Sequence, residues 1–351
     1  APYKLDELVR FRVPYYVGPM IAPEKTKDKQ KQANQSFAWM VRKEPGKITP
    51  WNFDQKVDRM ASANKFIKRM TTKDTYLLGE DVLPANSLLY QKFTVLNELN
   101  NIRINGKKIP VDCKQQIFDK LFKNNSLVTT KKLITFLKEN YKLVSVDIRG
   151  LADDKKFNSG LTTYNRLKHT QLFNQQIDNP KFRADLEQII EWSTIFEDKR
   201  IYKAKLETVD WLNEKQMNIL TNIRLQGWGR LSKKLLVNLH DSNGQNILEK
   251  LWDSQDNFMQ IINEADFKEV ITEANQSQMQ SSTMEDILAD AYTSPANKKA
   301  IRQVMKVVND IKKAASSKDP KQIAIEFARE PEANPQITHV RGSRLQEIYK
   351  S

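Results

Sequence analysis

The chain contains a single cysteine, Cys113, among its 351 residues. One cysteine excludes an internal disulfide and any zinc site that needs several cysteines. Histidines are also few, and they are too scattered to indicate a metal cluster: His169, His240 and His339. No apolar run approaches the roughly 18 residues that a membrane-spanning helix needs. These shortages argue against a membrane protein and favour a reducing, cytoplasmic location.

Acidic residues are outnumbered, with 43 Asp and Glu against 57 Lys and Arg, which leaves a formal net charge of +14. A surplus of this size attracts polyanions such as nucleic acid, an acidic protein or an anionic membrane surface. Hydrophobic residues make up 39% of the chain, enough to build a core and to exclude wholesale disorder. The length permits two or three domains.

Helical spacing of apolar residues dominates from about residue 113 onward. Most of the 10 glycines fall between the periodic stretches, as helix connections require. The spacing predicts a mainly α protein. Its expected helices carry these apolar faces: Leu133, Ile134 and Leu137, with Thr129 or Thr130 as N-cap; Phe182, Leu186, Ile189 and Ile190; Met217, Leu220 and Ile223; Leu231, Leu235 and Leu239; and Ile301, Val304, Met305, Val308 and Ile311.

One segment departs from helical spacing. Residues 321–330 place Ile323, Ile325 and Phe327 on one side of a predicted strand, and two alanines around Glu326 on the other. A carboxylate between small side chains leaves space for a hard cation. A single carboxylate is not a metal site, however, and an exposed residue on an edge strand fits the spacing equally well.

Two clusters combine basic and aromatic residues. Trp228 and Arg230 alternate with glycines, so the backbone could approach a ligand that meets the indole face and the guanidinium fork. A turn that ends a helix and buries the tryptophan is the alternative. Arg12 and Tyr15 lie near Pro14, where a packed aromatic turn is the alternative.

Asn257, Met259 and Gln260 lie in a segment where a helix could begin. Amides at a helix start can donate to phosphate oxygens, although they more often cap the helix. The chain contains no glycine-rich phosphate loop and no Ser/His/Asp arrangement.

Several strings add information through their order and spacing. Together they closely resemble the large RNA-guided DNA endonucleases of type II-A CRISPR systems, from about residue 11 to about residue 330. The strings are residues 13–19 (VPYYVGP), 37–40 (FAWM), 48–53 (ITPWNF), 82–84 (VLP), 87–90 (SLLY), 227–232 (GWGRLS), 257–260 (NFMQ), 294–295 (SP), 306–308 (KVV) and 323–330 (IAIEFARE).

The resemblance implies a role for each matching position. Positions that contact the guide RNA–target DNA hybrid, mainly its backbone, correspond to Arg12, Tyr15, Tyr90, Trp228, Arg230, Met259 and Gln260. Glu326 corresponds to a catalytic, Mg²⁺-binding glutamate of the second RuvC segment. Ala85 and Asn263 stand where relatives carry lysine and histidine, so we expect those contacts to be missing here.

The same resemblance predicts the domain order. Residues 1–71 would end one helical recognition domain, 72–293 would form an elongated helical recognition domain, and 294–351 would hold a short RuvC-type helix–strand segment with a connector. We expect the chain to be an internal piece of the endonuclease, because the other RuvC segments and the HNH nuclease module are absent from it. It should therefore be catalytically inactive and bind no Mg²⁺ alone, although the complete enzyme would use Mg²⁺.

The function that the resemblance implies is to clamp the hybrid backbone and to sense its pairing, so that imperfect pairing withholds cleavage, as is general for RNA-guided nucleases of this family. The expected partners are guide RNA, target DNA, the remaining nuclease domains and a phage-encoded anti-CRISPR inhibitor, in the cytoplasm of a bacterium. One alternative is a basic, all-α scaffold that docks an acidic protein or nuclease inhibitor, and another is an autonomous nuclease.

Overall fold

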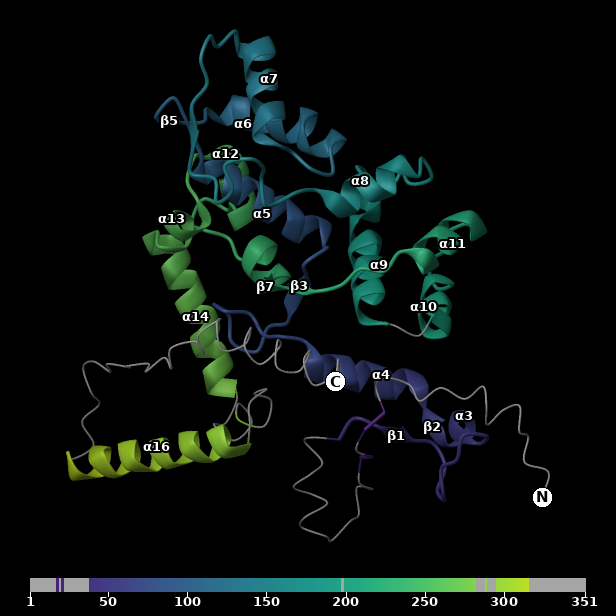
Figure 1. The fold of residues 1–351 in the computed structure, drawn as a ribbon. Coiled ribbons are helices and arrows are strands. Elements are labelled where there is room, and N and C mark those ends of the chain that lie inside the picture. The colour runs from purple at the N-terminus through teal and green to yellow at the C-terminus, as the bar shows by residue number, and fades with distance from the viewer. Residues whose placement is uncertain are drawn as a thin grey trace, which may run out of the picture. The chain divides into compact units, whose positions relative to one another are not determined.

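The computed structural model describes residues 17–18, 20–21, 38–196, 199–281, 288 and 295–315. Its contacts divide the chain into two compact units, residues 1–292 and residues 293–351. The described residues are mainly helical with a few short strands, which confirms the predicted fold class (Figure 1). Among them, no helix is both long and apolar enough to cross a membrane.

Helices make up most of the first unit, and short 3₁₀ turns, named η2 and η3, join some of them. In chain order the helical elements are α3 (Phe53–Lys56), α4 (Arg59–Met70), α5 (Leu88–Asn101), α6 (Val111–Lys120), η2 (Phe122–Asn124), α7 (Thr130–Tyr141), α8 (Thr162–His169), η3 (Pro180–Phe182), α9 (Arg183–Ile195), α10 (Lys199–Leu206), α11 (Glu214–Asn222), the π-helical turn η4 (Lys234–Asn238), α12 (Ile247–Asp253), α13 (Phe258–Ile262) and α14 (Ala265–Ser281). The second unit contains α16 (Pro295–Ala314).

The strands are short and form small antiparallel pairings. They are β1 (Val41–Arg42), β2 (Val57–Asp58), β3 (Val82–Pro84), β4 (Arg103–Ile104), β5 (Lys107–Lys108), β6 (Ile148–Arg149) and β7 (Trp228–Ser232). β1 pairs with β2, β3 with β7, and β4 with both β5 and β6.

Four of the five predicted apolar stripes lie on helices of the structure. In α7 the predicted N-cap is confirmed as Thr129, whose side chain accepts a hydrogen bond from the backbone N–H of Lys132 at 3.3 Å. Such a cap satisfies a backbone donor that has no partner inside the helix. The stripes at 182–190, 217–223 and 301–311 coincide with α9, α11 and α16.

The prediction of a helix from Leu231, Leu235 and Leu239 is wrong. Leu231 lies in strand β7, and only Lys234–Asn238 form a helical turn, of the π type. Register along β7 is set by its partner β3, where Val82 faces Ser232 and Pro84 faces Trp228. Local spacing of leucines cannot report a partner that lies about 150 residues away in the chain.

Helix α5 is central to the core of the first unit. It packs against α6, α8 and α12, and buries Leu89, Phe93, Val95, Leu96 and Leu99. Ser87 caps its first turn by accepting a hydrogen bond from the Tyr90 N–H at 3.1 Å. Because α5 follows β3 directly, the core fixes the position of the β3–β7 pair, which lie side by side in Figure 1.

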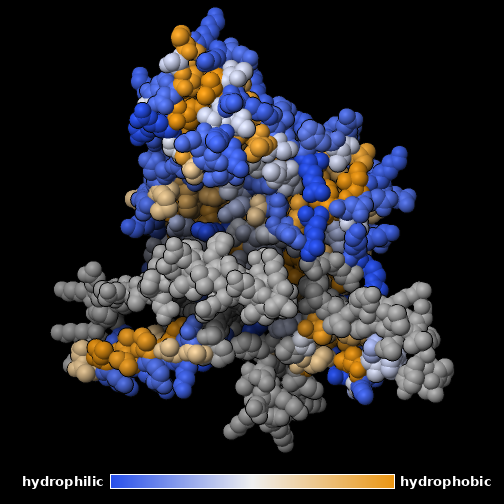
Figure 2. All heavy atoms as spheres, in the orientation of Figure 1, coloured by the Kyte–Doolittle hydropathy of each residue, from blue (hydrophilic) through white to orange (hydrophobic). Residues whose placement is uncertain are grey.

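Helix α16 is strongly amphipathic. Its apolar side chains line one face of the helix, shown as orange spheres in Figure 2, and Val304 and Ile311 are each 60% exposed. The strand predicted for residues 321–330, which includes Glu326, lies outside the described residues.

Candidate nucleic-acid interface

The first cluster of candidate residues lies on strand β7. Its pairing with β3 contains an irregularity between Val82 and Pro84, which changes the register along the pair. This pairing excludes the alternative of a turn that ends a helix. It also brings Trp228 and Arg230 to the start of α5, where Tyr90 lies. We call Tyr90, Trp228 and Arg230 the strand end.

Gly229 is what allows the strand end to form. A Cβ at this position would lie 2.6 Å from Cε2 of Tyr90 and 2.9 Å from the carbonyl oxygen of Leu83, closer than Cβ contacts can be. Gly227 has φ +92°, a left-handed conformation that glycine adopts without steric cost. The two glycines thus let β7 pack directly on the tyrosine ring.

The backbone of Arg230 is fully used in this packing. Its N–H donates to the Tyr90 hydroxyl at 3.1 Å, and its carbonyl oxygen accepts from both the N–H and the hydroxyl of Thr75 at 3.3 Å. The Arg230 side chain is exposed, and its guanidinium has no partner among the residues that the structure describes. A fixed backbone with a free guanidinium suits an anion such as phosphate.

The buried carboxylate of Asp74 supports the strand end from the protein interior. Asp74 accepts hydrogen bonds from the N–H of Tyr76 at 2.7 Å, from the N–H of Leu77 at 3.2 Å and from the N–H of Ser232. The carboxylate therefore ties the 74–77 turn to the end of β7. Trp228 is half-buried, so part of its indole ring remains accessible.

The second cluster lies at the start of α13 and comprises Asn257, Met259 and Gln260, which we call the cap end. The side chain of Asn257 accepts from the Gln260 N–H at 2.9 Å, and the side chain of Gln260 accepts from the Asn257 N–H at 3.0 Å. This reciprocal capping box is the helix-cap alternative considered for these amides, and it is present. Met259 is 53% exposed, and its sulfur accepts from the Tyr76 hydroxyl at 3.6 Å.

A chain of aromatic rings connects the two ends. Tyr90 and Phe93 have ring centroids 5.7 Å apart, Phe93 and Phe258 5.2 Å, and Phe258 and Tyr76 5.4 Å. The last two pairs meet edge to face, an arrangement that aromatic quadrupoles favour. Because Tyr76 also contacts Met259, the strand end and the cap end are parts of one packed surface.

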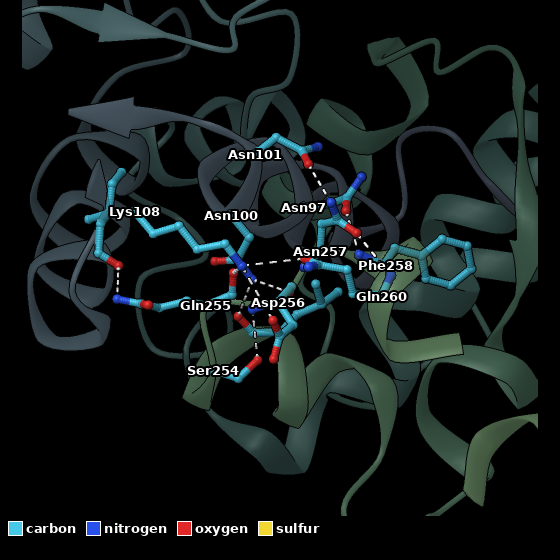
Figure 3. Close-up of polar contacts among 12 residues, drawn as sticks. Asn97, Asn100, Asn101, Lys108, Ser254, Gln255, Asp256, Asn257, Phe258 and Gln260 are labelled. Carbon is cyan, nitrogen blue, oxygen red and sulfur yellow. Dashed lines mark hydrogen bonds and ion pairs between the residues drawn. The ribbon is translucent and has the colours of Figure 1, made fainter. Parts of the chain in front are cut away.

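Sequence analysis missed a set of polar side chains that position the cap end. The connection between α12 and α13 is held from several sides (Figure 3). Asn100 donates to the carbonyls of Leu251 at 3.1 Å and Asp256 at 2.7 Å. Lys108 donates to the Gln255 carbonyl at 2.9 Å. The connection that precedes α13 is therefore fixed by residues that lie about 150 positions earlier in the chain.

Lys114 contributes from α6 and is fully buried. Its ammonium donates to the carbonyls of Leu251, at 2.6 Å, and of Ser254. Burial lowers the pKa of Lys114 to about 8, and the carboxylates of Asp253 and Asp256 partly oppose this shift. The available signal was a lysine at helical spacing from apolar residues, since Lys114 is followed by Ile117 and Phe118.

The remaining candidates are not placed. Arg12, Tyr15 and Glu326 lie outside the described residues. Within the described part of the chain, no group of three or more His, Cys, Asp or Glu side chains could hold a metal ion. The structure thus brings together Tyr90, Trp228, Arg230, Met259 and Gln260.

Comparisons with known proteins agree on one family. Residues 1–275 match a family model described as the REC lobe of the CRISPR-associated endonuclease Cas9. The CRISPR-associated endonuclease Cas9 of Streptococcus mutans serotype c is 39% identical over 341 residues, which are 93% of this chain and 24% of that protein. The Listeria innocua serovar 6a protein of the same name is 39% identical over 339 residues, with the same coverage. This chain therefore spans 24% of the length of either relative.

Proposed function

This chain belongs to the family of Cas9 recognition lobes, and on that premise we propose that it binds the sugar–phosphate backbone of a guide RNA–target DNA hybrid. The observation that carries the proposal is the strand end, where an exposed guanidinium and a partly exposed indole stand on a strand fixed by Tyr90. The net charge of +14 supports it, because a basic surface attracts and retains a polyanion.

The chemistry of the surface favours contacts to the backbone over contacts to base edges. The hybrid's bases are paired, so a protein that lies along it meets phosphates and sugars first. Arg230 can bind a phosphate with its planar fork, while Trp228 can pack against a sugar. Met259 adds an apolar contact at the cap end. Such contacts report the shape of the hybrid and are independent of its sequence.

A surface of this kind could also license cleavage in the whole protein. A mismatched segment does not maintain the regular backbone spacing that two fixed contact points require. The strand end and the cap end are held in one packed unit by the aromatic chain, so both engage only a regular hybrid. We propose that incomplete engagement withholds the conformational step that permits cleavage.

The test is binding of the 351-residue chain to a hybrid of about 20 base pairs across a salt series, with DNA and RNA duplexes as competitors. We expect the chain to bind the hybrid more tightly than either duplex. The logarithm of its affinity for the hybrid should fall linearly with the logarithm of the salt concentration. Trp228→Ala/Arg230→Ala should weaken binding for every hybrid sequence alike, and Arg230→Ala should reduce the salt slope by about 1. Arg166→Ala, which removes the same charge from an exposed position on α8, is the matched control.

Equal binding of all duplexes, or sequence-dependent losses in the variants, would contradict a backbone clamp for the hybrid. The competing proposal is a scaffold for an acidic protein, including an anti-CRISPR inhibitor. It predicts that an acidic protein displaces nucleic acid equally well from the unvaried chain and from Trp228→Ala. Measuring displacement from the unvaried chain and from Trp228→Ala separates the two proposals.

For enzymology, our proposal is that this chain alone does not cut nucleic acid. Glu326 would be one Mg²⁺ ligand of a RuvC-type site, and a single carboxylate does not hold the metal. Titration of Mg²⁺ into the chain should therefore give no heat of binding, and incubation with plasmid and Mg²⁺ should leave the plasmid intact. Mg²⁺-dependent cutting that Glu326→Ala abolishes would overturn this part of the proposal.

A further inference from the structure

An open groove of about 520 Å³ runs along one side of α5. The helix contributes residues at helical spacing, and the opposite wall comes from the segment between residues 150 and 162. The groove is lined mainly by polar, uncharged residues, among them Asn97, Asn101, Asn158 and Ser159.

The groove adjoins the strand end. Ala85 lines it, and the N–H of Ala85 donates to the carbonyl of Gly227 at 3.0 Å, beside Trp228. Asn101 lies at the other end of the groove and contacts Asn257 of the cap end. The groove therefore runs from one end of the candidate interface to the other.

The orientation of the Asn97 amide follows from a backbone donor. The N–H of Phe258 donates to Oδ1 of Asn97 at 2.8 Å. A backbone N–H can only donate, so the oxygen of the amide must face α13. The NH₂ group of Asn97 then points the other way, and Figure 3 shows its nitrogen directed away from the α12–α13 connection.

A second backbone donor fixes Asn101 through an intermediate amide. The Gln260 N–H donates to Oδ1 of Asn257, so the NH₂ group of Asn257 points away from the helix and donates to Oδ1 of Asn101 at 2.8 Å. Asn101 must therefore present its own NH₂ group outward. In Figure 3 the nitrogens of Asn97 and Asn101 point to the same side.

Gln260 follows the same rule. Its Oε1 accepts from the Asn257 N–H at 3.0 Å and from Nζ of Lys108 at 3.4 Å. Two donors fix the oxygen inward, which leaves the Gln260 NH₂ group as a donor to the outside. Three amides from two helices thus share one polarity, with oxygens toward the protein and NH₂ groups outward.

The one carboxylate of the groove is occupied by the opposite wall. Glu98 accepts from the N–H of Asn158 at 3.0 Å and from the N–H of Ser159 at 2.9 Å, and also from the Ser159 hydroxyl. These hydrogen bonds hold the wall against α5 and direct the carboxylate oxygens toward it. None of these hydrogen bonds uses the amide NH₂ group of Asn97 or of Asn101.

We infer that this groove is a further backbone subsite, in which the amide NH₂ groups of Asn97 and Asn101 donate to phosphate oxygens of the bound hybrid. The inference rests on the proposed function and adds binding residues to it. An array of oriented donors without positive charge selects an acceptor-rich ligand, and phosphate oxygens are the acceptors that such a hybrid presents. Neutral donors release no counterions, so their contribution does not depend on salt.

The experiment compares isosteric variants of the 351-residue chain in binding to the RNA–DNA hybrid. Asn97→Asp and Asn101→Asp keep the inward oxygen and its hydrogen bond, but replace the outward donor with a carboxylate oxygen. Each should weaken hybrid binding about tenfold, because a donor to phosphate becomes a repelling acceptor. Asn218→Asp makes the same chemical change at an exposed position on α11 and should leave the affinity unchanged.

A second variant separates loss of the donor from gain of charge. Asn101→Ala should lower the affinity at every salt concentration and leave the salt slope unaltered, whereas Arg230→Ala reduces the slope by about 1. Unchanged affinity in both Asn→Asp variants, together with weakened binding by Arg230→Ala, would overturn the subsite and leave the proposed function standing. Failure of the unvaried chain to bind the hybrid would overturn both.

Discussion

The strand end and the cap end present similar chemistry to solvent, but they are built in different ways. At the strand end, backbone groups make the structural bonds, and the Arg230 side chain extends from them without a partner among the described residues. At the cap end, side-chain amides make the structural bonds, since Asn257 and Gln260 form the capping box of α13, and Gln260 also presents its NH₂ group to the outside.

This difference has a consequence for mutagenesis. A side chain that only extends from a fixed backbone can be removed with little change in the free energy of unfolding. A capping amide cannot, because its loss leaves backbone donors unsatisfied. We therefore expect stability and binding to separate at the strand end and to change together at the cap end.

The largest expected effect on stability comes from Gly229→Ala at the strand end. The added methyl would overlap the Tyr90 ring and the Leu83 carbonyl, and backbone oxygen cannot move away as a flexible side chain could. We expect the free energy of unfolding to fall by about 3 kcal/mol. Urea denaturation of the purified variant measures it.

Gly244→Ala is the control for this variant. Gly244 has φ +77°, and no atom lies within 4 Å of the position that an added methyl would take. Only the backbone conformation therefore opposes alanine there, at a cost of about 1 kcal/mol. Equal losses in the two variants would show that the strand end does not depend on close packing at Gly229.

Lys114→Met tests the support behind the cap end. The substitution removes the donor to the Ser254 carbonyl and one of the two side-chain donors to the Leu251 carbonyl, which keeps Asn100, and we expect a loss of about 2 kcal/mol. Lys120→Met, at an exposed position on the same helix, is the matched control. An unchanged unfolding midpoint in Lys114→Met would show that the connection is held by the other donors alone.

The comparison of the unvaried chain with Lys114→Met also predicts how the free energy of unfolding depends on pH. Burial lowers the pKa of Lys114 from 10.5 to about 8, so between these pH values the unfolded chain binds the proton more than the folded chain does. Stability from this group therefore rises with pH across that window. The difference in unfolding free energy between the unvaried chain and Lys114→Met should widen as pH rises from about 8 to 10.5, and a flat difference would contradict the buried position of the ammonium.

Asn257→Ala should cost less but affect both properties. Loss of the N-cap of α13 should lower stability by about 1 kcal/mol. It should also weaken hybrid binding, because Asn257 orients the amide of Asn101. Asn213→Ala removes the same type of capping box from α11 and should match the stability loss without a change in hybrid affinity. Loss of affinity in both variants would indicate general destabilisation instead.

The helices of this fold could be predicted well from the sequence because their signal is local. The stripe of Leu133 and Leu137 and the cap at Thr129 lie within one element, and α7 begins where they indicate. The leucines at 231, 235 and 239 carried a similar local pattern, yet β7 forms because Val82 and Pro84 pair with it from a distance. Short strands with distant partners give no comparable periodicity.

The residues of the candidate interface differ in the same way, because local sequence patterns select some of them and others depend on distant partners. Trp228 and Arg230 could be selected from the glycines around them, and those glycines do permit the close approach to Tyr90. No local pattern selects Tyr90, which entered only through family resemblance. Asn97, Asn101 and Lys114 were not predicted, because their roles depend on the α12–α13 connection, which is about 150 residues away in sequence.

The smallest expected effect is that of Tyr90→Phe, which sharpens the comparison at the strand end. The variant keeps the ring that packs on Gly229 and removes only the hydroxyl that accepts from the Arg230 N–H at 3.1 Å. Because this N–H lies at an exposed position, water can replace the hydroxyl, and the free energy of unfolding should fall by only about 0.5 kcal/mol. The free energy of hybrid binding should weaken by more than the free energy of unfolding falls, since the hydroxyl fixes the backbone from which the guanidinium extends. Measurement of both quantities on one preparation, by urea denaturation and by hybrid titration, decides the point. A loss of stability with no change in affinity would mean that the position of Arg230 is set by the β3–β7 pairing alone.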